Sequence, residues 1–181
     1  MQRLVGALAV LLVAGAAVAQ GPPAKPDPPA NDPAQTTASY GDWVLRCVRT
    51  AENATGPRAC ELVQTMVLQG QQQPVAQVAL GYDKADLRFT LVVPPAISFS
   101  RNPVLGAAGA ATPRFDLAWR RCLPSGCFAD VLVGPELQKI LRGRTEPMQI
   151  AFRDAGEREA ALPLSFRGLV PALDALAKEP R

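Results

Sequence analysis

The amino-acid sequence predicts an all-β fold: an antiparallel β-sandwich or barrel of about eight strands, with two short helices in its C-terminal third. Three observations lead to this prediction. Apolar and polar residues alternate with a period of two in several segments, as in half-buried strands. Clusters of proline, glycine, asparagine and aspartate separate these segments. Helical spacing of apolar residues indicates two short helices in the last third.

Composition limits the classes of function that the chain can have. Its 181 residues include 19 basic and 16 acidic ones, for a net charge of +3, and the arginines are scattered. This balance argues against nucleic acid as the main partner. The chain contains no histidine, which removes histidine-activated nucleophiles, histidine general bases and histidine-ligated zinc. Any chemistry would then have to rest on carboxylates, lysine or a cofactor. We predict no catalytic residues, no bound cofactor and no metal site.

Residues 1–19 have the pattern of a secretory signal peptide. A short positive start precedes an apolar stretch over residues 4–13, which is too short to span a bilayer. Small residues then precede a cleavage point that we expect between Ala19 and Gln20. No later segment is apolar for long enough to cross a membrane. We expect a periplasmic protein, or one secreted or held at the cell surface.

Residues 20–39 are rich in proline and alanine. Proline lacks the N–H group that helices and sheets need, so we expect an extended, disordered linker. The folded domain is expected over residues 40–178, as a single domain large enough to bury a core.

The first predicted hairpin begins the domain. Trp43, Leu45 and Cys47 alternate with more polar neighbours, and the same alternation returns from Cys60 onward. Residues 51–57 between them have turn composition. The two cysteines are therefore expected at facing positions, with Trp43 packed beneath them in the core.

Further strands are expected over residues 75–82 and 87–93, and a short one over residues 97–99. Two prolines end the second of these strands, because neither can donate a hydrogen bond to a neighbouring strand. Residues 102–111 are rich in glycine and alanine without periodicity, and we expect them to form a loop.

A second hairpin is expected around Cys122 and Cys127. Phe115, Leu117 and Trp119 alternate before it, and a Leu-Pro-Ser-Gly stretch separates the cysteines, as suits a tight reversal. Four residues between the cysteines do not match a thioredoxin-type motif, and no histidine or further cysteine remains to complete a zinc site.

An even number of cysteines behind an export signal favours two structural disulfides. Four cysteines allow three connectivities, and the sequence alone does not choose among them. We favour Cys47–Cys60 and Cys122–Cys127, because each pair brackets a hairpin.

The last third is expected to hold both helices. Pro135 lies in the first turn of one, with an apolar stripe at helical spacing, and Gly143 ends it. Strands are expected over residues 148–152 and 159–164, and Pro171 lies in the first turn of the final helix. Several arginines give this part a basic character, which we interpret as a solvated face rather than an anion or lipid head-group site: Arg142, Arg144, Arg153, Arg158 and Arg167.

The order of these motifs resembles the invasion-associated locus B family of bacterial proteins, over residues 40–178. The resemblance implies export to the periplasm or outer surface. In pathogens the family is named for a role in host-cell invasion, notably of red cells, whereas its members in harmless bacteria indicate a general envelope role. It supplies no catalytic residues. Residues 92–95 match its pattern more loosely. The motifs are Tyr40-Gly-Asp-Trp-x-x-x-Cys47, Cys60-x-Leu-x-Gln64, Arg120-x-Cys-Leu-Pro-x-Gly-Cys127, Leu141-Arg-Gly143 and Leu162-Pro-Leu-Ser-Phe-x-Gly-Leu169.

Three hypotheses for the function fit these sequence features. The first is a non-catalytic exported domain that binds a protein partner in the envelope or on a host surface; an exposed apolar or aromatic patch would indicate it. The second is an envelope enzyme with paired carboxylates facing each other across a cleft. The third is an inhibitor or escort of another exported protein, indicated by an unpaired sheet edge. Candidate carboxylates for the second function are Asp42, Asp83, Asp86, Asp116 and Asp130.

Overall fold

The computed structural model describes residues 34–49, 56–67, 70, 72–107 and 113–180. The expected signal peptide, its cleavage point at Ala19 and Gln20, and most of the expected linker lie outside the described residues.

Eleven strands and two helices form in the described part of the chain, which confirms the all-β prediction and exceeds its strand count. The strands are β1 (Gln35–Tyr40), β2 (Trp43–Val48), β3 (Ala59–Val67), β4 (Pro74–Asp83), β5 (Asp86–Val93), β6 (Val104–Gly106), β7 (Arg114–Asp116), β8 (Ala118–Leu123), β9 (Gly126–Leu132), β10 (Met148–Arg153) and β11 (Glu159–Leu164). The helices are α1 (Pro135–Gly143) and α2 (Leu169–Leu176).

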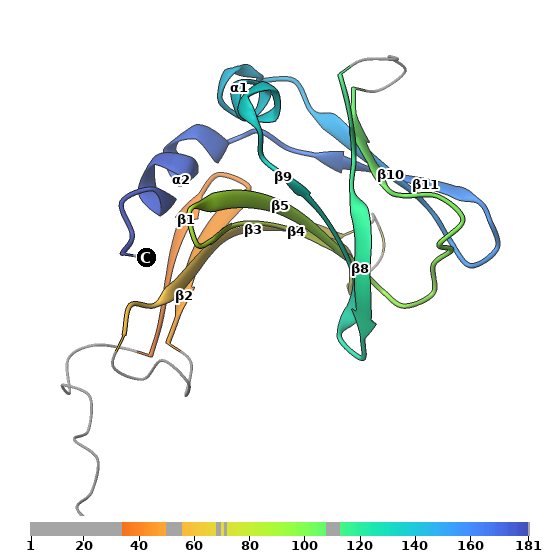
Figure 1. Cartoon of the computed structure of the whole chain (residues 1–181), viewed down its shortest axis with the longest axis horizontal. Coiled ribbons are helices and arrows are strands. Elements are labelled where there is room, and N and C mark those ends of the chain that lie inside the picture. Colours follow the sequence, from red (N-terminus) through yellow and green to blue (C-terminus); the bar gives the residue numbers. More distant parts are fainter. Residues whose placement is uncertain (1–33, 50–55, 68–69, 71, 108–112, 181) are drawn as a thin grey trace, which may run out of the picture.

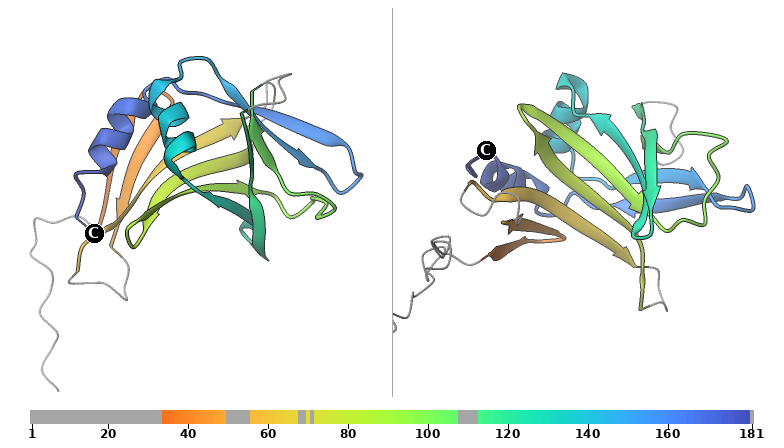
Figure 2. Two further views of the ribbon diagram at one scale, coloured as in Figure 1. Left: turned by 45° about the horizontal axis from the view of Figure 1, so that its top comes forward. Right: turned by 60° about the horizontal axis from the view of Figure 1, so that its bottom comes forward.

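Two antiparallel sheets build a sandwich-like fold rather than a closed barrel. The larger sheet has seven strands in the order β1-β2-β3-β4-β5-β9-β8, and the smaller has four in the order β11-β10-β6-β7. Figure 1 shows α1 and α2 on the same side of the larger sheet, with β10 and β11 beside it. Figure 2 shows the opposite side of the larger sheet without a covering helix. The core therefore lies between the larger sheet, the helices and the smaller sheet.

The period-two pattern decides which side chains enter that core. Trp43, Leu45 and Cys47 of β2 are buried, whereas Val44 and Arg46 between them face outward. The strands β4 and β5 repeat the pattern, and their inward residues are almost fully buried: Ala76, Val78, Leu80, Phe89, Leu91 and Val93. Hydrophobic burial of this row holds the sheet in one register, because a shift of one residue would expose it.

The expected linker ends earlier than predicted. Its last residues form β1, which pairs along its whole length with β2. The cause is the two-residue connection Gly41-Asp42, in which Gly41 has φ +60°, as the first central position of a type II′ hairpin turn requires. Hydrogen bonding to β2 then extends the sheet by one edge strand.

Two expectations for the middle of the chain were also wrong. Residues 104–106 form β6 instead of a loop, because β10 and β7 pair with them from either side. The expected strand at residues 97–99 is reduced to one bridge between Ile97 and Asp154. The alternating residues Phe115, Leu117 and Trp119 do not form one strand. The chain passes at Leu117 from β7 of the smaller sheet to β8 of the larger one.

Both predicted helices are present. Pro135 begins α1, whose Leu137 and Leu141 are buried, and α2 packs its buried residues on β1, β2 and β3. Among the described residues, no helix has the length and apolar character needed to cross a membrane.

Candidate binding site at the edge of the larger sheet

The first and last sequence motifs meet in space and position α2. Gly41 and Gly168 both have positive φ, +60° and +84°, and their backbones touch. A Cβ atom on Gly41 would lie 2.6 Å from the carbonyl oxygen of Arg167. The Asp42 amide donates to that same oxygen, at 3.1 Å. Only glycine permits this approach, which ties the beginning of α2 to the β1–β2 turn.

Side chains reinforce this junction. The Trp43 indole Nε1 donates to the Ser165 carbonyl at 2.9 Å, and Trp43 itself is fully buried. Gln64 is the one buried polar residue in the described part of the chain, and its amide both donates to and accepts from the Ser165 backbone. These contacts assign Trp43 to the core, as predicted.

Asp42 is held by two partners. Its carboxylate accepts a hydrogen bond from the Ser165 hydroxyl at 2.6 Å and pairs with the Arg167 guanidinium, whose Nε lies 3.2 Å from it. The hydrogen bond from Arg167, and then that from Ser165, lower the pKa of Asp42 below its ordinary value of 3.8. Asp42 is therefore a structural residue of the junction.

The Asp42 contacts predict acid-dependent stability. Because the folded-state pKa is lowered, ionised Asp42 stabilises the fold above the ordinary pKa of about 4, and this contribution is lost as the pH falls through the lowered pKa. We expect Asp42→Asn to cost roughly 1 kcal/mol at pH 7, as for partly exposed ion pairs. Urea unfolding at pH 7 and pH 2 measures this, and the difference from wild type should be smaller at pH 2. An equal difference at both pH values would contradict the assignment.

The remaining candidate carboxylates are not assembled across a cleft. Asp130 pairs with Arg88 and Arg120. Asp83 and Asp86 face each other at the exposed end of the β4–β5 hairpin, and Asp83 pairs with Arg88. Asp116 pairs with Arg114 within β7.

The basic residues of the last third are engaged as well, which supports the solvated-face interpretation. Each lies within ion-pair or hydrogen-bond distance of a partner: Arg142 with Asp174, Arg144 with the Glu146 carbonyl, Arg153 with Glu157, Arg158 with Asp154 and Arg167 with Asp42.

All four cysteines form disulfides with their local partners. Cys47 and Cys60 are directly opposite each other on β2 and β3, as are Cys122 and Cys127 on β8 and β9. Both bridges therefore clamp neighbouring strands.

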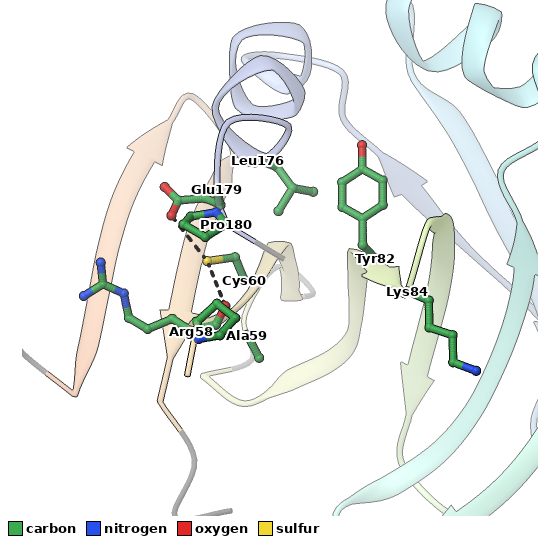
Figure 3. A pocket seen from close by; sticks show the side chains of 9 residues that line it. Arg58, Ala59, Cys60, Tyr82, Lys84, Leu176, Glu179 and Pro180 are labelled. Atoms are coloured by element: carbon green, nitrogen blue, oxygen red, sulfur yellow. Dashed lines mark hydrogen bonds between the residues drawn. The ribbon is translucent and has the colours of Figure 1, made fainter. Parts of the chain in front are cut away.

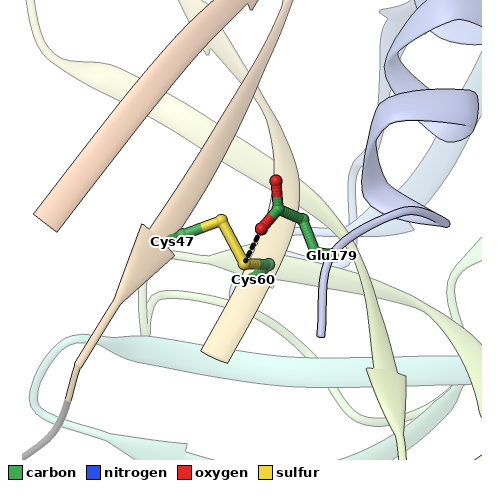
Figure 4. A group of neighbouring side chains, drawn as sticks. All are labelled: Cys47, Cys60 and Glu179. Carbon is green, nitrogen blue, oxygen red and sulfur yellow. Dashed lines mark hydrogen bonds between the residues drawn. A yellow bond between two sulfur atoms is a disulfide. The ribbon is translucent and has the colours of Figure 1, made fainter. Parts of the chain in front are cut away.

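A small hollow of about 250 Å³ lies beside the first bridge, and Figure 3 shows its lining. The Glu179 carboxylate approaches Cys60 Sγ at 3.7 Å (Figure 4). Cys47, Cys60 and Glu179 come close enough to resemble a metal site, and they are the one such group in the described part of the chain. They do not fit a metal, because both sulfurs are committed to the disulfide and neither is a thiolate.

A larger groove, of about 580 Å³, separates α2 from the edge of the larger sheet. Thr36, Thr37, Ala38 and Tyr40 of β1 line it on one side. Pro171, Asp174 and Ala175 of α2 line it on the other, with Lys178 and Glu179 just after the helix. The helix α2 contacts β1, β2 and β3, and the groove lies between it and the outermost of these strands.

The backbone of β1 presents unused hydrogen-bonding groups at this edge. The Cα atoms of Cys47 and Cys60 are 4.0 Å apart, which matches a non-hydrogen-bonded pair (about 4.5 Å) better than a hydrogen-bonded one (about 5.5 Å). The N–H and C=O of Cys47 therefore turn to Thr36 of β1. The Arg49 amide donates to the Ala34 carbonyl at 2.8 Å. This bond continues the same pattern, in which every second residue of one strand is hydrogen-bonded to the other strand.

It follows that Thr36, Ala38 and Tyr40 bond to β2, whereas the N–H and C=O groups of Gln35, Thr37 and Ser39 point away from the sheet. Within the described residues, no other strand pairs with β1 on this side. The described part of the larger sheet therefore has one edge that is free of charge and open.

The opposite edge of the same sheet is protected. On β8, Arg120 and Arg121 are exposed, and the pairing with β9 is irregular between Trp119 and Arg121. The Cys122–Cys127 bridge closes its far end. Charges and bulges of this kind discourage the addition of another strand, so the two edges differ in what they can bind.

The fold and this site define a disulfide-stapled β-sandwich domain whose described part has one open sheet edge, beside a groove lined by both apolar and charged side chains. The chain belongs to the invasion-associated locus B family, because the model of the "Invasion associated locus B (IalB) protein" family matches residues 43–177. A crystal structure of invasion associated protein b from Bartonella henselae is similar in fold, with a TM-score of 0.64 and 21% identity, covering 78% of this chain and 96% of that one. No curated protein matches the chain.

The sequence interpretation missed this site. Threonine and tyrosine in residues 35–40, followed by a Gly-Asp turn, are a strand and hairpin signal. The proline-rich composition just before them obscured it.

Proposed function

We propose that this protein is an exported, non-catalytic domain that binds a protein partner in the bacterial envelope or on a host surface. The observation that carries the proposal is the open edge of β1 beside the groove under α2. Such an edge offers backbone hydrogen-bond donors and acceptors, and the groove offers apolar surface. Domains commonly bind an extended protein segment through these two features together.

Export by a signal peptide cleaved after Ala19 belongs to the same proposal. Two disulfides support it, because such bridges persist in oxidising compartments and are rare in the cytosol. Membership of the family supports it too. The protein acts in the periplasm or at the surface, and in a pathogen it would serve host-cell invasion.

The absence of catalysis is also part of the proposal. Asp42, Asp83, Asp116 and Asp130 are each engaged by an arginine. The carboxyl groups with a clear shift, Asp42, Asp154 and Glu157, have lowered pKa values, whereas a general acid needs a raised one. This favours binding over hydrolysis.

The test is capture of a partner by the mature chain, residues 20–181, from an envelope extract of its own source. We expect the oxidised protein to retain one partner in a saturable manner and the reduced protein to lose it. The captured partner is then purified and its affinity measured by calorimetry. A monodisperse oxidised protein that retains nothing from envelope or host-cell surface extracts would overturn the proposal.

A further inference from the structure

We propose that the partner binds as an extended strand that adds antiparallel to β1, places large apolar side chains in the groove under α2, and sets an acidic residue at its C-terminal end beside Lys178. This inference rests on the proposed function and deepens it by naming the binding mode and the chemistry of the bound segment.

The backbone of β1 determines the mode. Gln35, Thr37 and Ser39 direct three N–H and three C=O groups away from β2, at every second residue. An added antiparallel strand satisfies all six of these groups, because its own donors and acceptors recur with the same period. The strand contains no proline, charged residue or irregular pairing that would interfere.

The groove determines which side chains the added strand should carry. An added strand points alternate side chains to the inner face of the sheet, in line with Thr36 and Ala38. These residues are small, and the facing wall of α2 is formed by Pro171, Asp174 and Ala175. A space of about 580 Å³ therefore remains for the incoming side chains, and large apolar residues fill it best.

The direction in which α2 runs determines which end of an added strand lies beside the charge of Lys178. Gly168, before α2, touches the Tyr40 carbonyl, whereas Glu179, after it, reaches Cys60 Sγ near the Cys47–Thr36 pair. The helix thus runs antiparallel to β1, and Lys178 lies near the N-terminal end of β1. An added antiparallel strand ends there.

Lys178 is the one cation that lines the groove, and it forms no ion pair in the described part of the chain. Of the two acids beside it, Asp174 is neutralised by Arg142 at 2.7 Å, and Glu179 turns toward the disulfide (Figure 4). An acidic residue on the incoming strand complements Lys178.

The groove favours a foreign segment over a second copy of this chain. A second copy that pairs edge to edge would bring its own Thr36 and Ala38 into the groove, and these are too small to fill it.

The test uses a library of random octapeptides selected on the oxidised mature chain. We expect the selected peptides to share large apolar residues at alternate positions and an acid near the C-terminus. Thr37→Pro removes one outward N–H group without removing a hydrogen bond to β2, and Ala175→Glu places charge on the groove wall. Each should weaken peptide binding at least tenfold, whereas Leu132→Thr, at an exposed position on β9, should leave it unchanged.

Amide hydrogen exchange locates the contact independently of any variant. On peptide binding, the amides of Gln35, Thr37 and Ser39 should gain protection. Failure of the selection, protection elsewhere, or equal binding by Thr37→Pro would overturn the inference. An envelope partner that Thr37→Pro and Ala175→Glu retain unchanged would overturn it too, while leaving the proposed function intact.

Discussion

Gly168→Ala is expected to destabilise the domain by about 3 kcal/mol or more. Gly168 has φ +84°, and an added Cβ would overlap the carbonyl oxygen of Tyr40. A left-handed conformation costs an L-residue about 1–2 kcal/mol, and the steric overlap adds about 1–3 kcal/mol. Since neither backbone can retreat without breaking the Asp42–Arg167 hydrogen bond, the beginning of α2 should shift. Urea unfolding of the oxidised protein measures the loss.

Gly143→Ala is the matched control. Gly143 ends α1, its φ is not in the left-handed region, and an added Cβ would meet no atom within 4 Å. We expect its free energy of unfolding to stay within about 0.5 kcal/mol of wild type, as for other surface changes. Similar losses at Gly143 and Gly168 would show that the close approach to Tyr40 does not matter.

Loss of the first disulfide should have a comparable effect. Cys47–Cys60 spans 13 residues, and the chain-entropy relation gives about 3 kcal/mol for a loop of this size. We therefore expect Cys47→Ala/Cys60→Ala to lower Tm by roughly 10 °C. The variant should also weaken peptide binding in the groove, because Cys47 lines the groove and β1 pairs with the strand that carries Cys47.

The second disulfide provides the comparison. Cys122–Cys127 spans five residues, for which the same relation gives about 2 kcal/mol. Its removal should therefore cost less and, because β8 is at the opposite edge of the sheet, leave peptide binding at β1 unchanged. Calorimetric melting of both double variants decides the order. A larger loss for the second pair would contradict the loop-length argument.

Local patterns made much of this fold predictable. Alternation placed Trp43, Leu45 and Cys47 on one face of a strand, and burial in the structure follows it. Turn residues placed the cysteines at facing positions of two hairpins. Pro135 and Gly143 marked the ends of a helix correctly. These signals succeed because each depends only on residues close together in the chain.

Two strands escaped prediction for the opposite reason. The residues of β6 have no periodicity of their own and become a strand only between β10 and β7. Similarly, β1 follows a proline-rich stretch and gains its conformation from pairing with β2. Strand formation at such positions is a tertiary effect, since the partner supplies the hydrogen bonds.

The sequence by itself determined the all-β class, the cysteine pairs that can face each other and the buried face of each central strand. Tertiary structure alone decided that Tyr40 meets Gly168 and that Asp42 pairs with Arg167, more than a hundred residues away. It also decided that β1 is an open edge with a groove under α2. Alternation and turn signals act over a few residues, whereas an edge and a groove exist only once distant segments have packed.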